Sequence, residues 1–188
     1  IPKIFEESGA VFVYATTEPE EALLLGGNCA TLWQGRVTQF GPTPRVYRQP
    51  VDATTARVFS DPPMNFMTIS KTGGTLMFGK GQSAKATGPL ADLADGRYLA
   101  GFRPNHLEIA RHKDGALQFD ARVIVTELTG SETFVHLNHH DDTWVGLVHG
   151  VHDLKPGTAQ PVYLDPAHVY IFTEAGDLVA PASYALAA

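Results

Sequence analysis

The second half of the chain consists of short apolar segments separated by turn residues at close, regular intervals. Glycine and proline are frequent, with 18 Gly and 13 Pro in 188 residues, so many turns are expected. Many short strands joined by such turns indicate a small closed β-barrel or a β-sandwich. Asp114-Gly115 also predicts a tight hairpin between segments 107–110 and 117–127. The expected strands are 66–71, 75–79, 98–102, 107–112, 117–127, 134–137, 144–148, 160–164 and 169–172.

The first sixty residues have a mixed α/β character. The continuous apolar run 11–15 predicts a strand buried on both faces, as in a parallel sheet. Thr17-Glu18-Pro19-Glu20 fits a capping box, with Thr17 as the N-cap of a helix that ends at Gly26. We therefore expect two units, residues 1–60 and 61–188, which the chain length allows. The other elements expected here are the end of a helix at 4–9, a hairpin over 31–40 that turns at Gly35, and short helices at 45–47 and 54–59.

Composition excludes several classes of protein. A content of 44% hydrophobic and 18% charged residues is that of a globular protein rather than a disordered one. The net charge of −6 and the lack of a long basic run argue against nucleic acid as a partner. Cys29 is the single cysteine, which excludes an intrachain disulfide and a cysteine zinc site and fits a reducing cytoplasm.

The N-terminus is neither a signal peptide nor an initiator methionine, and no apolar run in the sequence is long enough to span a bilayer. We therefore expect the chain to begin inside a larger protein or after processing.

Motifs in the first half follow one another in a specific order. Segment 13–23 reads VYATTEPEEAL, 35–41 reads GRVTQFG, 44–50 reads PRVYRQP and 61–66 reads DPPMNF. In this order they resemble the ATPases of ABC transporters, in the branch that imports sugars. There the first segment holds the switch histidine and the others form the hairpin and junction that follow it.

Motifs in the second half continue the resemblance. Segments 101–107 (GFRPNHL), 127–133 (ELTGSET) and 165–172 (DPAHVYIF) are similar to the transport-associated OB (TOBE) domain of the same proteins. The resemblance implies a mainly β, OB-like small barrel or sandwich (TOBE/MOP-like), preceded by an α/β remnant of a P-loop ATPase domain. It also implies that the chain is the C-terminal regulatory or accessory region of an importer ATPase for a sugar or polyol-type solute.

Further expectations come from the same resemblance. The parent protein would use ATP and Mg²⁺, lie in the cytoplasm at the inner (plasma) membrane, and work with membrane permease subunits and a second ATPase subunit. The OB-like domain would support a homodimer. The chain itself lacks the Walker A, Walker B and signature motifs, so we expect no cofactor in it and no activity from it alone.

Thr17 is the departure that bears on catalysis. It stands where the family has its switch histidine, which contacts the γ-phosphate and helps to hold the attacking water. Threonine cannot accept or relay a proton as imidazole does. We therefore expect the parent to contribute an impaired site beside a competent partner, although Thr17 is also an ordinary helix N-cap residue.

Two further patterns have structural readings that are favoured over chemical ones. Segment 74–80 (GTLMFGK) fits the first seven positions of a P-loop, but Gly81 stands where the Mg²⁺-binding hydroxyl belongs and no helix former follows, so a hairpin is expected. His136, His139 and His140 are weak metal candidates beside Asp141 and Asp142. Their spacing fits no zinc pattern, and a polar hairpin loop is expected there.

The remaining polar and aromatic candidates also favour structural roles. Arg103 is expected to pair with a carboxylate at a turn fixed by Pro104, followed by His106. Glu127 and Glu132 are expected to be exposed beside a turn at Gly130, rather than to act as an acid/base pair, and Trp33 and Trp144 to lie in the core.

One alternative function stays open at this point: an OB-like module that binds a small oxyanion or an oligosaccharide.

Overall fold

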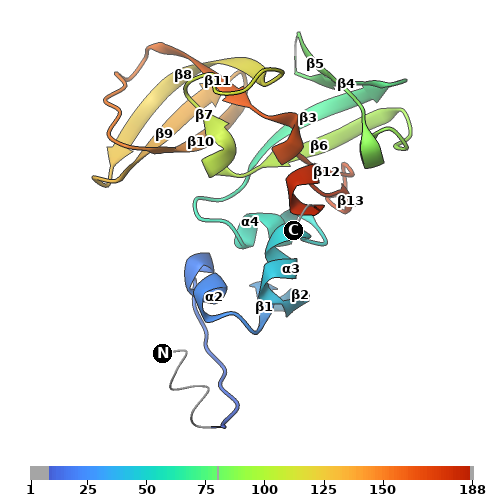
Figure 1. Cartoon of the computed structure of the whole chain (residues 1–188), viewed down its shortest axis with the longest axis vertical. Coiled ribbons are helices and arrows are strands. Elements are labelled where there is room, and N and C mark those ends of the chain that lie inside the picture. Colours follow the sequence, from blue (N-terminus) through green and yellow to red (C-terminus); the bar gives the residue numbers. More distant parts are fainter. Residues whose placement is uncertain (1–8, 80, 187–188) are drawn as a thin grey trace.

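The computed structural model describes residues 9–79 and 81–186. A small N-terminal part with three helices lies below a broad β part (Figure 1). The helices are α2 (Pro19–Leu25), α3 (Thr43–Arg48) and α4 (Ala53–Val58). The strands are β1 (Asn28–Trp33), β2 (Arg36–Pro42), β3 (Asn65–Thr72), β4 (Thr75–Phe78), β5 (Gln82–Lys85), β6 (Gly96–Phe102), β7 (Leu107–Glu108), β8 (Leu117–Leu128), β9 (Glu132–His139), β10 (Asp142–His149), β11 (Ala159–Leu164), β12 (Tyr170–Phe172) and β13 (Leu178–Ala180).

The β part contains two antiparallel sheets. One has the strand order β10-β9-β8-β11-β7 and the other β13-β12-β6-β3-β4-β5. Strand β3 alternates buried and more exposed residues along its length, as a strand with one face on a core must. The mainly β, small-barrel class expected from the sequence is confirmed.

The two sheets enclose one main core that is centred on Trp144 of β10. Its ring meets Phe102 at 5.2 Å and Phe119 at 5.4 Å between centroids, both edge to face. Its indole N–H donates to the Phe66 carbonyl at 3.2 Å, so this buried polar atom is satisfied. The expected core role of Trp144 is confirmed, whereas Trp33 is about half exposed and is not a core residue.

Asn65 joins the two sheets. Its amide nitrogen donates to the Val145 carbonyl and its amide oxygen accepts from the Val145 N–H, both at 2.8 Å. The side chain thus takes the place of a neighbouring strand along the edge of β10. Both backbone groups of Val145, which lie in a part-buried position, thus have hydrogen-bond partners.

In the N-terminal part, several predicted elements are confirmed. Strands β1 and β2 form the expected hairpin, and its turn uses Gln34 and Gly35 at φ 48° and 76°. Positive φ at both central residues suits the twist of a two-residue hairpin, and glycine adopts it without strain. Helices α3 and α4 lie where the short helices were expected, and α2 ends at Gly26 as predicted.

Other predicted elements are wrong. Segment 11–15 forms no strand, because none of the described strands lies beside it to take its backbone hydrogen bonds. Asp114-Gly115 makes a turn, yet β7 pairs with β11 and β8 pairs with β9 and β11, so no hairpin joins β7 to β8. The helix end predicted at 4–9 falls almost entirely outside the described residues.

Contacts cross the division expected at residue 60. Ala56 of α4 packs in a second apolar cluster with Met64, Tyr170, Phe172 and Ala182. The division into 1–60 and 61–188 stays a prediction. None of the helices among the described residues is long and apolar enough to cross a bilayer.

Candidate functional site

Thr17 lies in an exposed segment just before α2. Its hydroxyl donates to the Glu18 carboxylate at 3.3 Å. The N-cap of α2 is Glu18, whose side chain makes no capping bond, so the N-cap prediction for Thr17 is wrong. The reason is that Thr16 makes the local turn, with its hydroxyl accepting from the Glu18 N–H at 2.9 Å.

Acidic groups surround this segment. Glu21 accepts hydrogen bonds from the Thr16 hydroxyl at 2.5 Å and from the Tyr14 hydroxyl at 3.2 Å. Glu18 and Glu20 lie nearby on the chain, and no basic residue stands in α2. The negative charge near Tyr14 raises the pKa of its phenol. This segment by itself therefore offers no positive charge to a triphosphate.

Segment 11–14, helix α2 and the hairpin β1–β2 expose large apolar side chains. Val11 and Val13 are almost fully exposed, and Phe40 is 69% exposed. Single exposed apolar residues are normal on protein surfaces, whereas a group of them marks a contact surface. We call this group the N-terminal apolar surface, and it comprises Val11, Phe12, Val13, Tyr14, Leu24, Leu32, Trp33, Val37 and Phe40.

Arg103 connects the two parts of the molecule. Its side chain is 1% exposed, and its guanidinium donates to the carbonyls of Phe59 at 2.8 Å and Tyr47 at 2.6 Å. The guanidinium carbon lies 3.7 Å from the centre of the Tyr47 ring. Backbone carbonyls and an aromatic ring face thus stabilise this charge. The prediction that Arg103 pairs with a carboxylate is therefore wrong. The turn at Pro104 is confirmed.

His106 follows Arg103 and stacks on His168. The ring centroids are 3.9 Å apart at an interplanar angle of 17°, and Tyr184 meets both rings edge to face. Burial lowers the pKa of His106 to about 3, with further lowering by the neighbouring His168 and Arg103. Burial also lowers the pKa of His168, so both rings are neutral near pH 7. This cluster is structural packing that the sequence did not reveal.

The structure brings His139 and His140 together, with ring centroids 4.4 Å apart, but not His136. His139 is buried, stacks on Trp144 and bonds through Nδ1 to the Asp120 carbonyl at 2.8 Å. His136 points to the other face of β9 and pairs with Glu127 at 3.0 Å. His140 occupies the β9–β10 turn at φ 52°. No three His, Cys, Asp or Glu side chains in the described part of the chain are grouped to hold a metal ion.

The remaining candidates are placed as structural elements. Residues 74–79 form the β3–β4 hairpin and strand β4, with no helix to follow as a P-loop requires, and Lys80 falls outside the described residues. Glu127 and Glu132 do not converge, since Glu127 pairs with His136 and Glu132 lies 3.9 Å from His149. The expected turn at Gly130 is confirmed, and Glu127 is exposed as predicted, whereas Glu132 is only partly exposed.

Comparison with known families identifies part of this architecture. The family model described as "TOBE domain" matches residues 100–172, which run from β6 to the end of β12. Residues 100–172 are thus similar to the TOBE domain family. The match includes Arg103 and His106 as well as the whole five-stranded sheet, so the residues that meet the N-terminal part lie within the matched region.

Relatives of the chain extend the TOBE domain match toward the N-terminus. The xylose/arabinose import ATP-binding protein XacK of Haloferax volcanii is 31% identical over 72% of this chain and 36% of its own length. The sn-glycerol-3-phosphate import ATP-binding proteins UgpC of Vibrio vulnificus and Cupriavidus pinatubonensis are 28% and 26% identical over 93% and 92% of the chain. These matches cover 47% and 50% of the two UgpC proteins, so the chain spans half of their length or less.

A solved structure, the cytoplasmic molybdate-binding protein ModG, aligns with 58% of the chain at a TM-score of 0.45 and 15% identity.

Proposed function

We propose that the chain is the C-terminal accessory region of the ATP-binding subunit of an ABC importer for a sugar or polyol-type solute, and that it is not catalytic alone. The N-terminal apolar surface is the observation that carries the proposal. The matches to the UgpC proteins cover 92% and 93% of this chain, and those proteins are about twice as long as the chain. The nucleotide-binding core of the same protein would cover this surface.

ATP and Mg²⁺ belong to the remainder of the parent protein in this proposal. A triphosphate needs clustered backbone N–H groups and a lysine, and Mg²⁺ needs hydroxyl and carboxylate oxygens beside them. The described residues do not fit such a site, because segment 74–79 is a hairpin and the surroundings of Thr17 are acidic. The parent would lie in the cytoplasm against the membrane, beside permease subunits and a second ATPase subunit.

A titration of the 188-residue chain with ATP, molybdate, tungstate and a sugar separates this proposal from the alternative. We expect no tight binding of nucleotide, because the phosphate-binding elements are missing. Tight binding of molybdate, tungstate or the sugar would favour the small-ligand module instead. Tight binding of ATP by the chain alone would contradict the proposal.

Thr17 gives the proposal a catalytic consequence. With threonine at the family's switch position, the parent would contribute an impaired site and depend on a competent partner subunit. We expect Thr17→His to raise ATP hydrolysis by the full-length homodimer by about a hundredfold or more, the usual contribution of a positioned acid or base. Steady-state phosphate release measures this rate.

Glu20→His serves as the control, because it places the same imidazole on the neighbouring exposed turn of α2. An unchanged rate in Thr17→His, or an unmodified homodimer as fast as its histidine-bearing relatives, would contradict the assignment of Thr17.

A further inference from the structure

The carbonyls that Arg103 binds lie at two helix ends. Tyr47 stands in the last turn of α3, and Phe59 is the C-cap of α4. Carbonyls at the end of a helix lack intrahelical partners and carry the negative end of the helix dipole. A single guanidinium therefore satisfies the ends of both helices, with two hydrogen bonds directed by its planar fork.

No carboxylate among the described residues forms an ion pair with this guanidinium. The buried charge is instead stabilised by the two carbonyls and the Tyr47 ring, with the Tyr170 ring at 6.0 Å. Removing the helix ends would leave the charge buried and unpaired, which costs several kcal/mol. The position of α3 and α4 and the burial of Arg103 therefore depend on each other.

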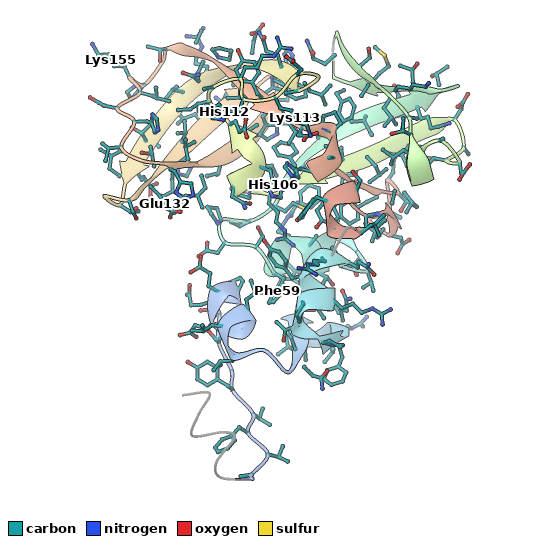
Figure 2. All side chains as sticks on the ribbon, viewed as in Figure 1. Phe59, His106, His112, Lys113, Glu132 and Lys155 are labelled. Atoms are coloured by element: carbon teal, nitrogen blue, oxygen red, sulfur yellow. The ribbon has the colours of Figure 1, made fainter. Side chains whose placement is uncertain are left out.

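The opposite end of α4 is held by the turn between β12 and β13. The Ala53 N–H donates to the Gly176 carbonyl at 2.8 Å, and the Leu178 N–H donates to the Val51 carbonyl at 3.0 Å. Strand β12 pairs with β6, the strand that ends directly before Arg103. Both ends of α4 are thus fixed to the same pair of strands. Figure 2 shows Phe59 at this junction, below His106 and the β part.

We infer that Arg103 is a positioning residue that locks α3 and α4 to the TOBE domain, so that the two parts of the chain move as one body. The connection 60–64 would otherwise act as a hinge. The lock is a property of this chain and needs no nucleotide. If the proposed function holds, its consequence is that a displacement of the TOBE domain is passed directly to the ATPase part.

Hydrogen exchange of the 188-residue chain tests the lock in Arg103→Lys and Arg103→Met. The reporting amides are those of Gln49 and Phe59, which close the last turns of α3 and α4. We expect exchange at both to be at least about tenfold faster in Arg103→Met, because two hydrogen bonds to a charged group are lost. The exchange rates in Arg103→Lys should lie between those of the wild type and of Arg103→Met, since an ammonium keeps the charge but lacks the planar pair of donors.

Strands β8 to β10 and a control variant distinguish a local effect at the helix ends from a general loss of stability. Arg111→Met removes an exposed arginine that follows β7, away from the β12–β13 turn, and it should leave the helix ends unchanged. In the Arg103 variants, amides of β8 and β9 should keep their exchange rates. Equal acceleration everywhere in both Arg103 variants would show that Arg103 is only a core residue. No acceleration at Gln49 and Phe59 would also overturn the inference.

A negative result in this experiment leaves the proposed function standing, because the ATP and oxyanion titrations are independent of it.

Discussion

At the level of single residues, the burial of His106 makes the stability of the folded chain depend on pH. Its ring lies between His168, Tyr184 and the Arg103 turn, and its Nδ1 atom has no hydrogen-bond partner among the described residues. A charged imidazole there would lose its hydration beside a guanidinium. The stacked pair therefore favours neutral rings, so protonation at low pH is expected to lower the stability of the folded chain.

The pKa of His106 is about 3 in the folded chain, against 6.5 for an unperturbed histidine. The unfolded state therefore binds more protons between these values, so the stability due to the neutral ring is complete above pH 6.5 and is lost as the pH falls toward 3. We expect the wild type to lose about 2 kcal/mol more than His106→Gln between pH 7 and 4.5. Urea unfolding at both pH values measures this difference.

His112→Gln is the matched control for His106→Gln, because His112 is 70% exposed and its Nδ1 lies 3.3 Å from Glu108. A wild type and a His106→Gln variant that lose equal stability over this pH range would contradict the assignment.

At the element scale, Asn65 replaces a missing strand. Its two hydrogen bonds to Val145 hold β3 of one sheet against the edge of β10 in the other. We expect Asn65→Leu to lower the free energy of unfolding by about 1 to 3 kcal/mol, because it leaves the part-buried N–H and C=O of Val145 without these partners. Chemical denaturation measures the loss.

Thr68→Val is the control for Asn65→Leu, since Thr68 lies on the exposed face of the same strand, β3. Asn65→Asp keeps the acceptor and loses the donor, so its stability should fall between the wild type and the leucine variant. A leucine variant as stable as the wild type would show that the Val145 groups find other partners.

Local patterns determined which elements could be predicted. The β1–β2 hairpin and β3 follow from turn chemistry and alternation, which depend on neighbouring residues. The predicted β7–β8 hairpin was wrong because both strands pair with β11, which lies far from them along the chain. The partners of Arg103 lie 44 and 56 residues away, and a bond to a backbone carbonyl leaves no residue type to recognise.

Across the whole molecule, the two parts of the chain differ in how well they bury their apolar side chains. The β part encloses a core in which Trp144, Phe102 and Ile171 are fully buried. The N-terminal part instead exposes Val11, Val13 and Phe40 to solvent. Arg103 and the β12–β13 turn fix the helices, whereas β1, β2 and segment 11–14 expose large apolar side chains. The UgpC relatives are about twice as long as this chain, and the proposed nucleotide-binding core would belong to the remaining length.

The proposed cover of the N-terminal apolar surface can be tested by comparing hydrogen exchange between the 188-residue chain and the full-length parent protein. We expect amides in segment 10–18 and in β1 and β2 to exchange much more slowly in the full-length protein, while β8 to β10 are unchanged, because a nucleotide-binding core would cover the N-terminal apolar surface. Equal exchange of segment 10–18 in the two proteins would contradict the claim.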